Sequence, residues 1–178
     1  MRKIVFLLLL GAANFLFAGN KLEFKIVTLP DMVFTGISVD ADQTNMSPVL
    51  QAWQDMMKVR GKIKNTVKKG EYWGVSYDYQ MTTTGLFFRY LAGVQVKGKS
   101  KPPKNMTTLK VESYTYAVFQ HKGKMDTLSQ TYSEIYQTAL PQSDYVPAQA
   151  PVLELYGKEF KQGQDDSVMY IYAPVIKK

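Results

Sequence analysis

Two neighbouring stretches decide the fold: residues 71–80, EYWGVSYDYQ, and residues 86–97, LFFRYLAGVQVK. Both are rich in Tyr, Phe and Val, which favour extended backbone on a pleated, half-buried surface. The sequence therefore predicts that they form a pair of β-strands.

A helix is predicted in front of this strand pair. Ser47 and Pro48 are typical of an N-cap and a first helical position, and Gly61 is a typical helix end. Apolar residues follow Pro48 at helical spacing: Val49, Leu50, Trp53 and Met57. Further upstream, apolar alternation over 22–28 predicts a strand, and 32–39 predicts a second one.

The same order of elements is predicted again downstream. A strand is expected at 109–120, broken near Ser113, and closing strands are expected at 152–160 and 168–176. Asp126 and Pro141 are expected to begin and end the second helix. The apolar residues of that helix are Leu128, Tyr132, Ile135, Tyr136 and Ala139.

Strand, helix, strand, strand thus occurs twice, in 22–97 and in 107–177. This order predicts an α+β fold of two modules related by a pseudo-twofold axis. Each helix has one apolar stripe, which must be buried against a sheet. A cleft between two related halves is a natural place for a ligand.

Composition limits the possible chemistry. The chain has 178 residues, 46% of them hydrophobic and 21% charged, which is typical of one globular domain. The absence of cysteine excludes disulfides, thiolate metal sites and a cysteine nucleophile. A single histidine, His121, gives little support to a histidine metal site or a catalytic triad, and we expect it to hold a turn by hydrogen bonding. No metal or cofactor is expected.

The first residues are typical of a secretory signal. Arg2 and Lys3 precede an apolar run from 4 to 17, and Ala18 offers a small residue before a polar turn. The run is shorter than the roughly 20 residues that span a bilayer. We expect a signal peptide at 1–18, a mature domain at 19–178 and a periplasmic or extracellular location. The alternative is an uncleaved N-terminal anchor.

Positive charge is concentrated in two runs. The first spans 58–69 with six Lys or Arg residues, and the second spans 97–104 with four lysines. Neither is interleaved with the aromatic residues that stack on nucleic-acid bases, so no nucleic-acid partner is expected. We interpret the runs as solvated loops, with contact to an anionic surface as the alternative.

Four segments, taken in order, resemble the GyrI-like or AraC-type effector-binding domains that bind small molecules. They are 72–77 (YWGVSY), 88–94 (FRYLAGV), 116–123 (YAVFQHKG) and 151–156 (PVLELY). The resemblance covers nearly the whole chain after the signal. It implies two strand-helix-strand-strand modules with an antiparallel sheet and two helices around a central cleft. It also implies binding of diverse compounds, often cationic and aromatic.

Glu154 is the predicted anchor of the ligand site. It resembles the acidic residue that such domains place in their cavity. It also lies between Leu153 and Leu155, so strand alternation turns its side chain to the opposite face. If aromatic rings line that face, the carboxylate is partly desolvated and favours a cation. The alternative is an ordinary solvent-facing glutamate.

Aromatic residues are the other candidate ligand contacts: Trp73, Tyr77, Tyr90, Tyr116 and Tyr156. Each could instead pack in the core. Related domains often carry an acidic residue beside the aromatic at Tyr90, whereas this chain has Arg89. If Arg89 lies close to Glu154, it would neutralise the carboxylate and weaken selectivity for cations.

The sequence therefore favours non-catalytic binding of a small hydrophobic or cationic ligand. One alternative is a hydrolase of strained, reactive molecules, as in some relatives, with Glu154 and Tyr116 or Trp73 as the catalytic pair. Another is an interaction module of the cell envelope that uses the basic loops as its contact surface.

Overall fold

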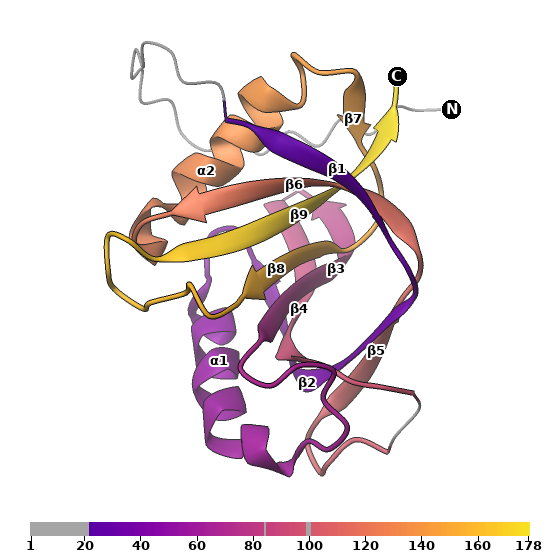
Figure 1. Ribbon diagram of the computed structural model, residues 1–178, viewed down its shortest axis with the longest axis vertical. Helices are drawn as coiled ribbons and strands as arrows, with labels where there is room; N and C mark the ends of the chain where they lie inside the picture. The colour runs from indigo at the N-terminus through magenta and orange to yellow at the C-terminus, as the bar shows by residue number, and fades with distance from the viewer. Residues whose placement is uncertain (1–21, 84, 99–100) are drawn as a thin grey trace.

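The computed structural model describes residues 22–83, 85–98 and 101–178, so the predicted signal lies outside the described residues. Nine antiparallel strands and two helices make up the described part of the chain (Figure 1). The strands are β1 (Phe24–Leu29), β2 (Met32–Asp42), β3 (Tyr72–Thr82), β4 (Gly85–Gln95), β5 (Thr107–Val111), β6 (Tyr114–Lys122), β7 (Tyr145–Pro147), β8 (Val152–Tyr156) and β9 (Val168–Lys177).

The strand order shows the pseudo-twofold relation directly. The sheet runs β1-β6-β9-β8-β3-β4-β2-β5, and β7 pairs with β9. The halves correspond strand by strand: β3 to β8, β4 to β9, β2 to β6 and β5 to β1. Exchanging corresponding strands gives the same order, read from the other edge of the sheet. The axis therefore passes between β3 and β8, at the centre of the sheet. The predicted α+β fold is confirmed.

The edge strands are exchanged between the halves. β1 pairs with β6 of the second half, while β5 pairs with β2 of the first. The predicted break near Ser113 makes this possible, because the chain leaves β5 and turns into β6 there. The Ser113 N–H donates to the Asp31 carboxylate at 2.8 Å, which ties this turn to the β1–β2 turn.

Both helices lie close to their predicted positions, but neither begins with a side-chain cap. The first helix, α1 (Ser47–Val59), follows Met46, and the Ser47 hydroxyl bonds to Asn45 instead of to the helix. The second, α2 (Leu128–Glu134), follows a 3₁₀ turn (Met125–Thr127) that contains Asp126, so Asp126 is not its cap. A π-helical turn (Ile135–Ala139) continues α2.

The two helices pack on one face of the sheet. Val49, Ala52 and Met56 of α1 share a core with Tyr90 and Ala92 of β4. The α2 side contributes Ile135, Ala139 and Leu140, packed with Phe119 of β6 and Ile171 of β9. The strand residues that alternate with these form a core on the other face: Phe34, Trp73, Val75, Leu91, Tyr116 and Leu153. No helix of the described residues is long and apolar enough to cross a membrane.

Candidate functional site

Glu154 lies at the centre of the fold, on the helix-covered face of β8. Its strand neighbours Leu153 and Leu155 belong to the core on the opposite face, as alternation requires. The side chain is not solvent-facing, since Glu154 is only 6% exposed. A buried carboxylate is costly unless partners compensate for its lost hydration.

Three tyrosine hydroxyls supply part of that compensation. Tyr90 of β4 and Tyr156 of β8 donate to Oε2 at 2.7 and 2.8 Å. Tyr132 of α2 donates to Oε1 at 2.7 Å. Both carboxylate oxygens therefore accept strong, charge-assisted hydrogen bonds.

The other helix reaches the same group through a second hydrogen bond. The indole N–H of Trp53, on α1, donates to the Tyr90 hydroxyl at 3.0 Å. The Trp53 ring also packs edge-on against Tyr156, with ring centroids 4.9 Å apart. One polar network thus joins α1, the sheet and α2 across the pseudo-twofold axis.

The three hydroxyls remain donors at neutral pH. Burial raises the pKa of Tyr90, Tyr132 and Tyr156 well above the usual value, and the negative charge of Glu154 raises it further. A tyrosinate beside a carboxylate in a desolvated site would be strongly disfavoured. The network is therefore a single anion held by neutral donors.

No ion pair to Glu154 is formed by the part of the chain that the structure describes. Arg89 directly precedes Tyr90 on β4, so strand alternation turns its side chain to the opposite face. Its guanidinium pairs there with Asp40 and Asp78, at 3.4 and 3.9 Å, and lies 5.4 Å from the Tyr77 ring centroid. The neutralisation of Glu154 by Arg89 considered from the sequence does not occur.

Of the predicted site residues, the structure brings Glu154, Tyr90 and Tyr156 together. Trp73, Tyr77 and Tyr116 lie on the opposite face, in the second core. Trp73 packs against Phe34 at 5.5 Å between centroids, and the Tyr77 hydroxyl bonds to Ser38 at 2.8 Å. The structure therefore does not bring Glu154 together with Trp73 or Tyr116, the partners considered for the hydrolase alternative.

Tyr116 has an unusual environment in that second core. It is fully buried, and its hydroxyl has no hydrogen-bond partner among the described residues. Burial, and to a smaller extent Tyr114, raises its pKa to about 12. Its ring packs edge-on against Tyr172, with centroids 6.2 Å apart.

The sequence interpretation missed Trp53 and Tyr132 as site residues. Both belong to the predicted apolar stripes of their helices, and both pack partly against the core. The sequence did offer an indication, because the N–H of a buried Trp and the O–H of a buried Tyr need a hydrogen-bond partner. Glu154, predicted to point away from the apolar side chains of its strand, was a candidate for that partner.

His121 has the structural role expected from the sequence. It is buried on β6, and its ring nitrogens lie 2.8 Å from the Thr131 hydroxyl and 3.2 Å from the Lys124 carbonyl. These bonds hold the turn that leads into α2. In the described ranges, no group of three or more His, Asp or Glu side chains is placed to hold a metal ion.

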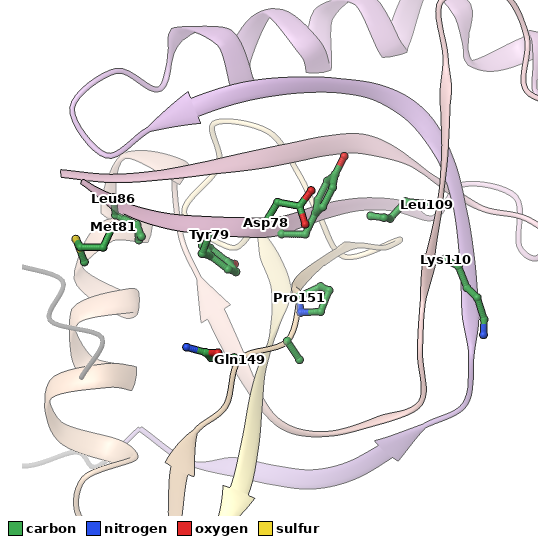
Figure 2. A pocket seen from close by; sticks show the side chains of 10 residues that line it. Asp78, Tyr79, Met81, Leu86, Leu109, Lys110, Gln149 and Pro151 are labelled. Carbon is green, nitrogen blue, oxygen red and sulfur yellow. The ribbon is translucent and has the colours of Figure 1, made fainter. Parts of the chain in front are cut away.

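A groove of about 410 Å³ lies beside the β3–β4 hairpin (Figure 2). It is lined by Tyr77, Asp78, Tyr79, Met81, Leu86, Leu109, Lys110, Gln149, Ala150 and Pro151. A β-bulge helps to shape it: the β3–β4 register shifts between Tyr77 and Gln80, and Asp78 adopts a φ of 52°. Tyr77 is the predicted site residue that lines this groove; Glu154 does not.

The sequence model of the family of GyrI-like small-molecule-binding domains matches residues 22–176 of this chain. This chain belongs to the GyrI-like family. The family binds small molecules, which supports a small-ligand partner in general terms.

Similar proteins agree with the assignment of this GyrI-like chain. The transcriptional regulator BrlR of Pseudomonas aeruginosa is 29% identical over 89 residues, which is 49% of this chain and 33% of BrlR. This chain therefore spans only about a third of that relative. SAV2435, solved bound to tetraphenylphosphonium, is 18% identical with a TM-score of 0.68, covering 87% of this chain and 94% of that one.

A second solved structure shows the fold in a larger protein. EcmrR, solved in a complex with DNA, is 16% identical with a TM-score of 0.68. The match covers 89% of this chain and 59% of EcmrR. At this level of identity the likeness concerns the fold.

Proposed function

We propose that this domain binds a lipophilic organic cation between α1 and α2, with Glu154 as the counter-ion. The observation that carries the proposal is a buried carboxylate with no cationic partner among the described residues. Buried charges are normally paired, because hydroxyl donors compensate only part of the lost hydration. A ligand cation would complete the site.

The walls of the site suit such a ligand. Trp53, Tyr90, Tyr132 and Tyr156 surround the carboxylate with aromatic rings. A cation over such a ring gains about 0.5–2 kcal/mol, most when it is desolvated. Aromatic rings and a single carboxylate select for positive charge and apolar surface, which is consistent with the lipophilic cation tetraphenylphosphonium in the solved SAV2435 structure.

The ligand is expected to enter by displacing Tyr132. Trp53 and Tyr132 are only partly buried, in contrast to Tyr90 and Tyr156. α2 has seven residues, no side-chain cap and a π-helical turn directly after it. Interruptions of this kind are frequent at functional sites. Movement of α2 would free Oε1 of Glu154 while Tyr90 and Tyr156 still hold Oε2.

Hydrolysis fits the surroundings of Glu154 less well. A catalytic pair must act together on one substrate. Neither Trp73 nor Tyr116 lies on the face of the sheet that carries Glu154, and the donors beside the carboxylate are neutral tyrosines. Binding therefore accounts for the geometry better than catalysis.

The proposal is tested by calorimetric titration of the full chain with tetraphenylphosphonium, using triphenylphosphine oxide as an uncharged aromatic probe. Glu154→Gln keeps the shape and an acceptor, and it should lower affinity for the cation at least tenfold while changing affinity for the neutral probe little. Glu23→Gln, at an exposed carboxylate, is the matched control. Undiminished cation binding by E154Q would refute the role of Glu154.

We also propose that the protein is exported. The support is the charged start, apolar run and small residue at 1–18. The mass of the protein recovered from a cell-surface or periplasmic fraction should correspond to a chain that begins at Gly19. Recovery of the full-length chain only from the cytoplasm would contradict export.

A further inference from the structure

Positive charge is segregated to one end of the molecule. The stretches 56–70 and 95–106 together contain ten Lys and Arg residues and no Asp or Glu. The rest of residues 22–178 has nine basic and fifteen acidic residues, a net charge of −6. The domain therefore has a strong charge asymmetry despite its modest overall charge.

The fold brings these two stretches side by side. Thr66 and Val96 form an antiparallel bridge. The Val67 N–H donates to Gln95 at 2.9 Å, and the Lys97 N–H donates to Asn65 at 2.8 Å. Both loops lie at the lower end of the view in Figure 1, where α1 ends and β4 ends. Backbone pairing thus makes one surface from two loops far apart in the sequence.

We call this surface the basic end. It consists of nine exposed residues: Lys58, Arg60, Lys62, Lys64, Lys68, Lys69, Lys97, Lys101 and Lys104. Lys58 and Lys68 pair with Asp55 and Glu71 at its margin. The remaining seven form no ion pair with any residue that the structure describes.

An apolar side chain stands among these charges. Val67 is 41% exposed, between Lys64 and Lys68–Lys69. Left-handed residues at Asn65 and Gly70 shape the loop on either side of it, with φ of 59° and 78°. An exposed hydrophobic side chain among basic residues suits an interface where charge lies outside and hydrocarbon lies beneath.

We propose that the basic end binds the surface of a bilayer that contains anionic phospholipids. The choice of partner rests on residue type, since eight of the nine residues are lysine. Lysine is a mobile point charge, suited to a diffuse layer of headgroups, and it is depleted in protein–protein interfaces, where Arg, Tyr and Trp dominate. No aromatic residue of 56–70 or 95–106 offers the anchor that a protein partner would need.

Attachment at this end leaves the Glu154 site free. The site lies at the centre of the sheet between α1 and α2, whereas the basic end lies beyond the carboxyl ends of α1 and β4. The proposal is independent of what Glu154 binds, because the two sets of residues do not overlap.

The test is sedimentation of the full chain with vesicles of phosphatidylcholine alone or with one third phosphatidylglycerol. The apolar residues 4–17 are common to all variants, so the measured quantity is the difference between the two lipids. Wild type should prefer the anionic vesicles, and the preference should fall as salt is raised. The variant K62Q/K64Q/K69Q/K101Q should bind the anionic vesicles more weakly, by about fivefold per lysine and so by a few hundredfold in total.

The matched control is K25Q/K122Q/K158Q/K177Q, which removes the same charge from exposed positions elsewhere. It should retain most of the preference, and circular dichroism should show both variants folded. Equal loss in the two variants, or equal binding of wild type to both lipids, would overturn the proposal. Binding to soluble polyglutamate without binding to vesicles would overturn it in favour of an acidic macromolecule.

Discussion

Gly74 lies directly opposite Glu154 in the β3–β8 ladder, and the missing side chain makes room for the network. A Cβ at Gly74 would stand 2.0 Å from the Tyr90 hydroxyl oxygen and 2.7 Å from Oε2 of Glu154. These are the two atoms of the buried hydrogen bond, so any side chain at this position would separate them. The φ of Gly74 is not left-handed, and its requirement is therefore for space.

Gly74→Ala should consequently damage both stability and ligand binding. The methyl group must displace Tyr90 or Glu154, and overpacking of this kind costs about 1–3 kcal/mol. Urea unfolding followed by circular dichroism measures the loss. Gly157→Ala is the control, since a Cβ at Gly157 meets nothing within 4 Å, and its effect should stay within about 0.5 kcal/mol. Equal effects would show that the space at Gly74 is not required.

Removing the hydroxyl of Tyr90 should destabilise the protein more than removing the hydroxyl of Tyr156. The Tyr90 hydroxyl accepts from Trp53 and donates to Glu154, so Tyr90→Phe leaves the buried indole N–H without its partner. The Tyr156 hydroxyl donates to Glu154, but the indole N–H of Trp53 bonds to Tyr90 and not to Tyr156. We expect a loss of about 2–3 kcal/mol for Y90F and about 1–2 kcal/mol for Y156F. The reverse order would contradict the two-bond role of Tyr90.

Strand alternation accounts for most of what the sequence predicted about this site. It predicts that the Glu154 side chain lies on the face of the sheet away from Leu153 and Leu155. It also predicts that the side chains of Arg89 and Tyr90 lie on different faces. Applied to β3, it could have excluded Trp73 and Tyr77, but only with the β3–β8 register known. That register pairs Gly74, not Trp73, with Glu154. Register depends on long-range pairing, which no local pattern of this sequence specifies.

Local sequence patterns also could not predict some contacts and boundaries of the helices and strands. Helical spacing in α1 and α2 predicts a buried face, but it does not say that Trp53 and Tyr132 meet a carboxylate. β7, with three residues, is too short for a periodicity. The predicted strand at 152–160 stops at Tyr156, because the chain turns at Gly157 and the Phe160 N–H bonds back to it at 3.1 Å.

Alkaline pH should destabilise the protein through the tyrosines of the network. The pKa of Tyr90, Tyr132 and Tyr156 is raised in the folded state, so above about pH 10 the unfolded chain loses protons that the native state keeps. Stability is therefore full below pH 10 and falls as pH rises, by about 1.4 kcal/mol per pH unit for each tyrosine. Urea unfolding between pH 9 and 11.5 measures the slope.

Single substitutions test whether the network tyrosines cause this slope. Tyr156→Phe should reduce the slope by about 1.4 kcal/mol per pH unit. Tyr170→Phe removes a hydroxyl that donates to the exposed Glu159 at 3.3 Å, outside the network, and should change the slope less. Absorbance at 295 nm should show the buried hydroxyls ionising together with unfolding. Ionisation of all twelve tyrosines before unfolding would contradict the buried network.

Arg89 should have no influence on cation binding, although it adjoins Tyr90 in the sequence. Its guanidinium lies on the opposite face of the sheet, with Asp40 and Asp78. Because those ion pairs are exposed, Arg89→Gln should change the free energy of unfolding by less than about 1 kcal/mol. The affinity of the Arg89→Gln variant for tetraphenylphosphonium should remain within about twofold of wild type. Glu154→Gln, in contrast, should abolish the preference for the cation over triphenylphosphine oxide. A marked gain of cation affinity in R89Q would instead show that Arg89 reaches the carboxylate in solution, and that β4 departs from the alternation described above.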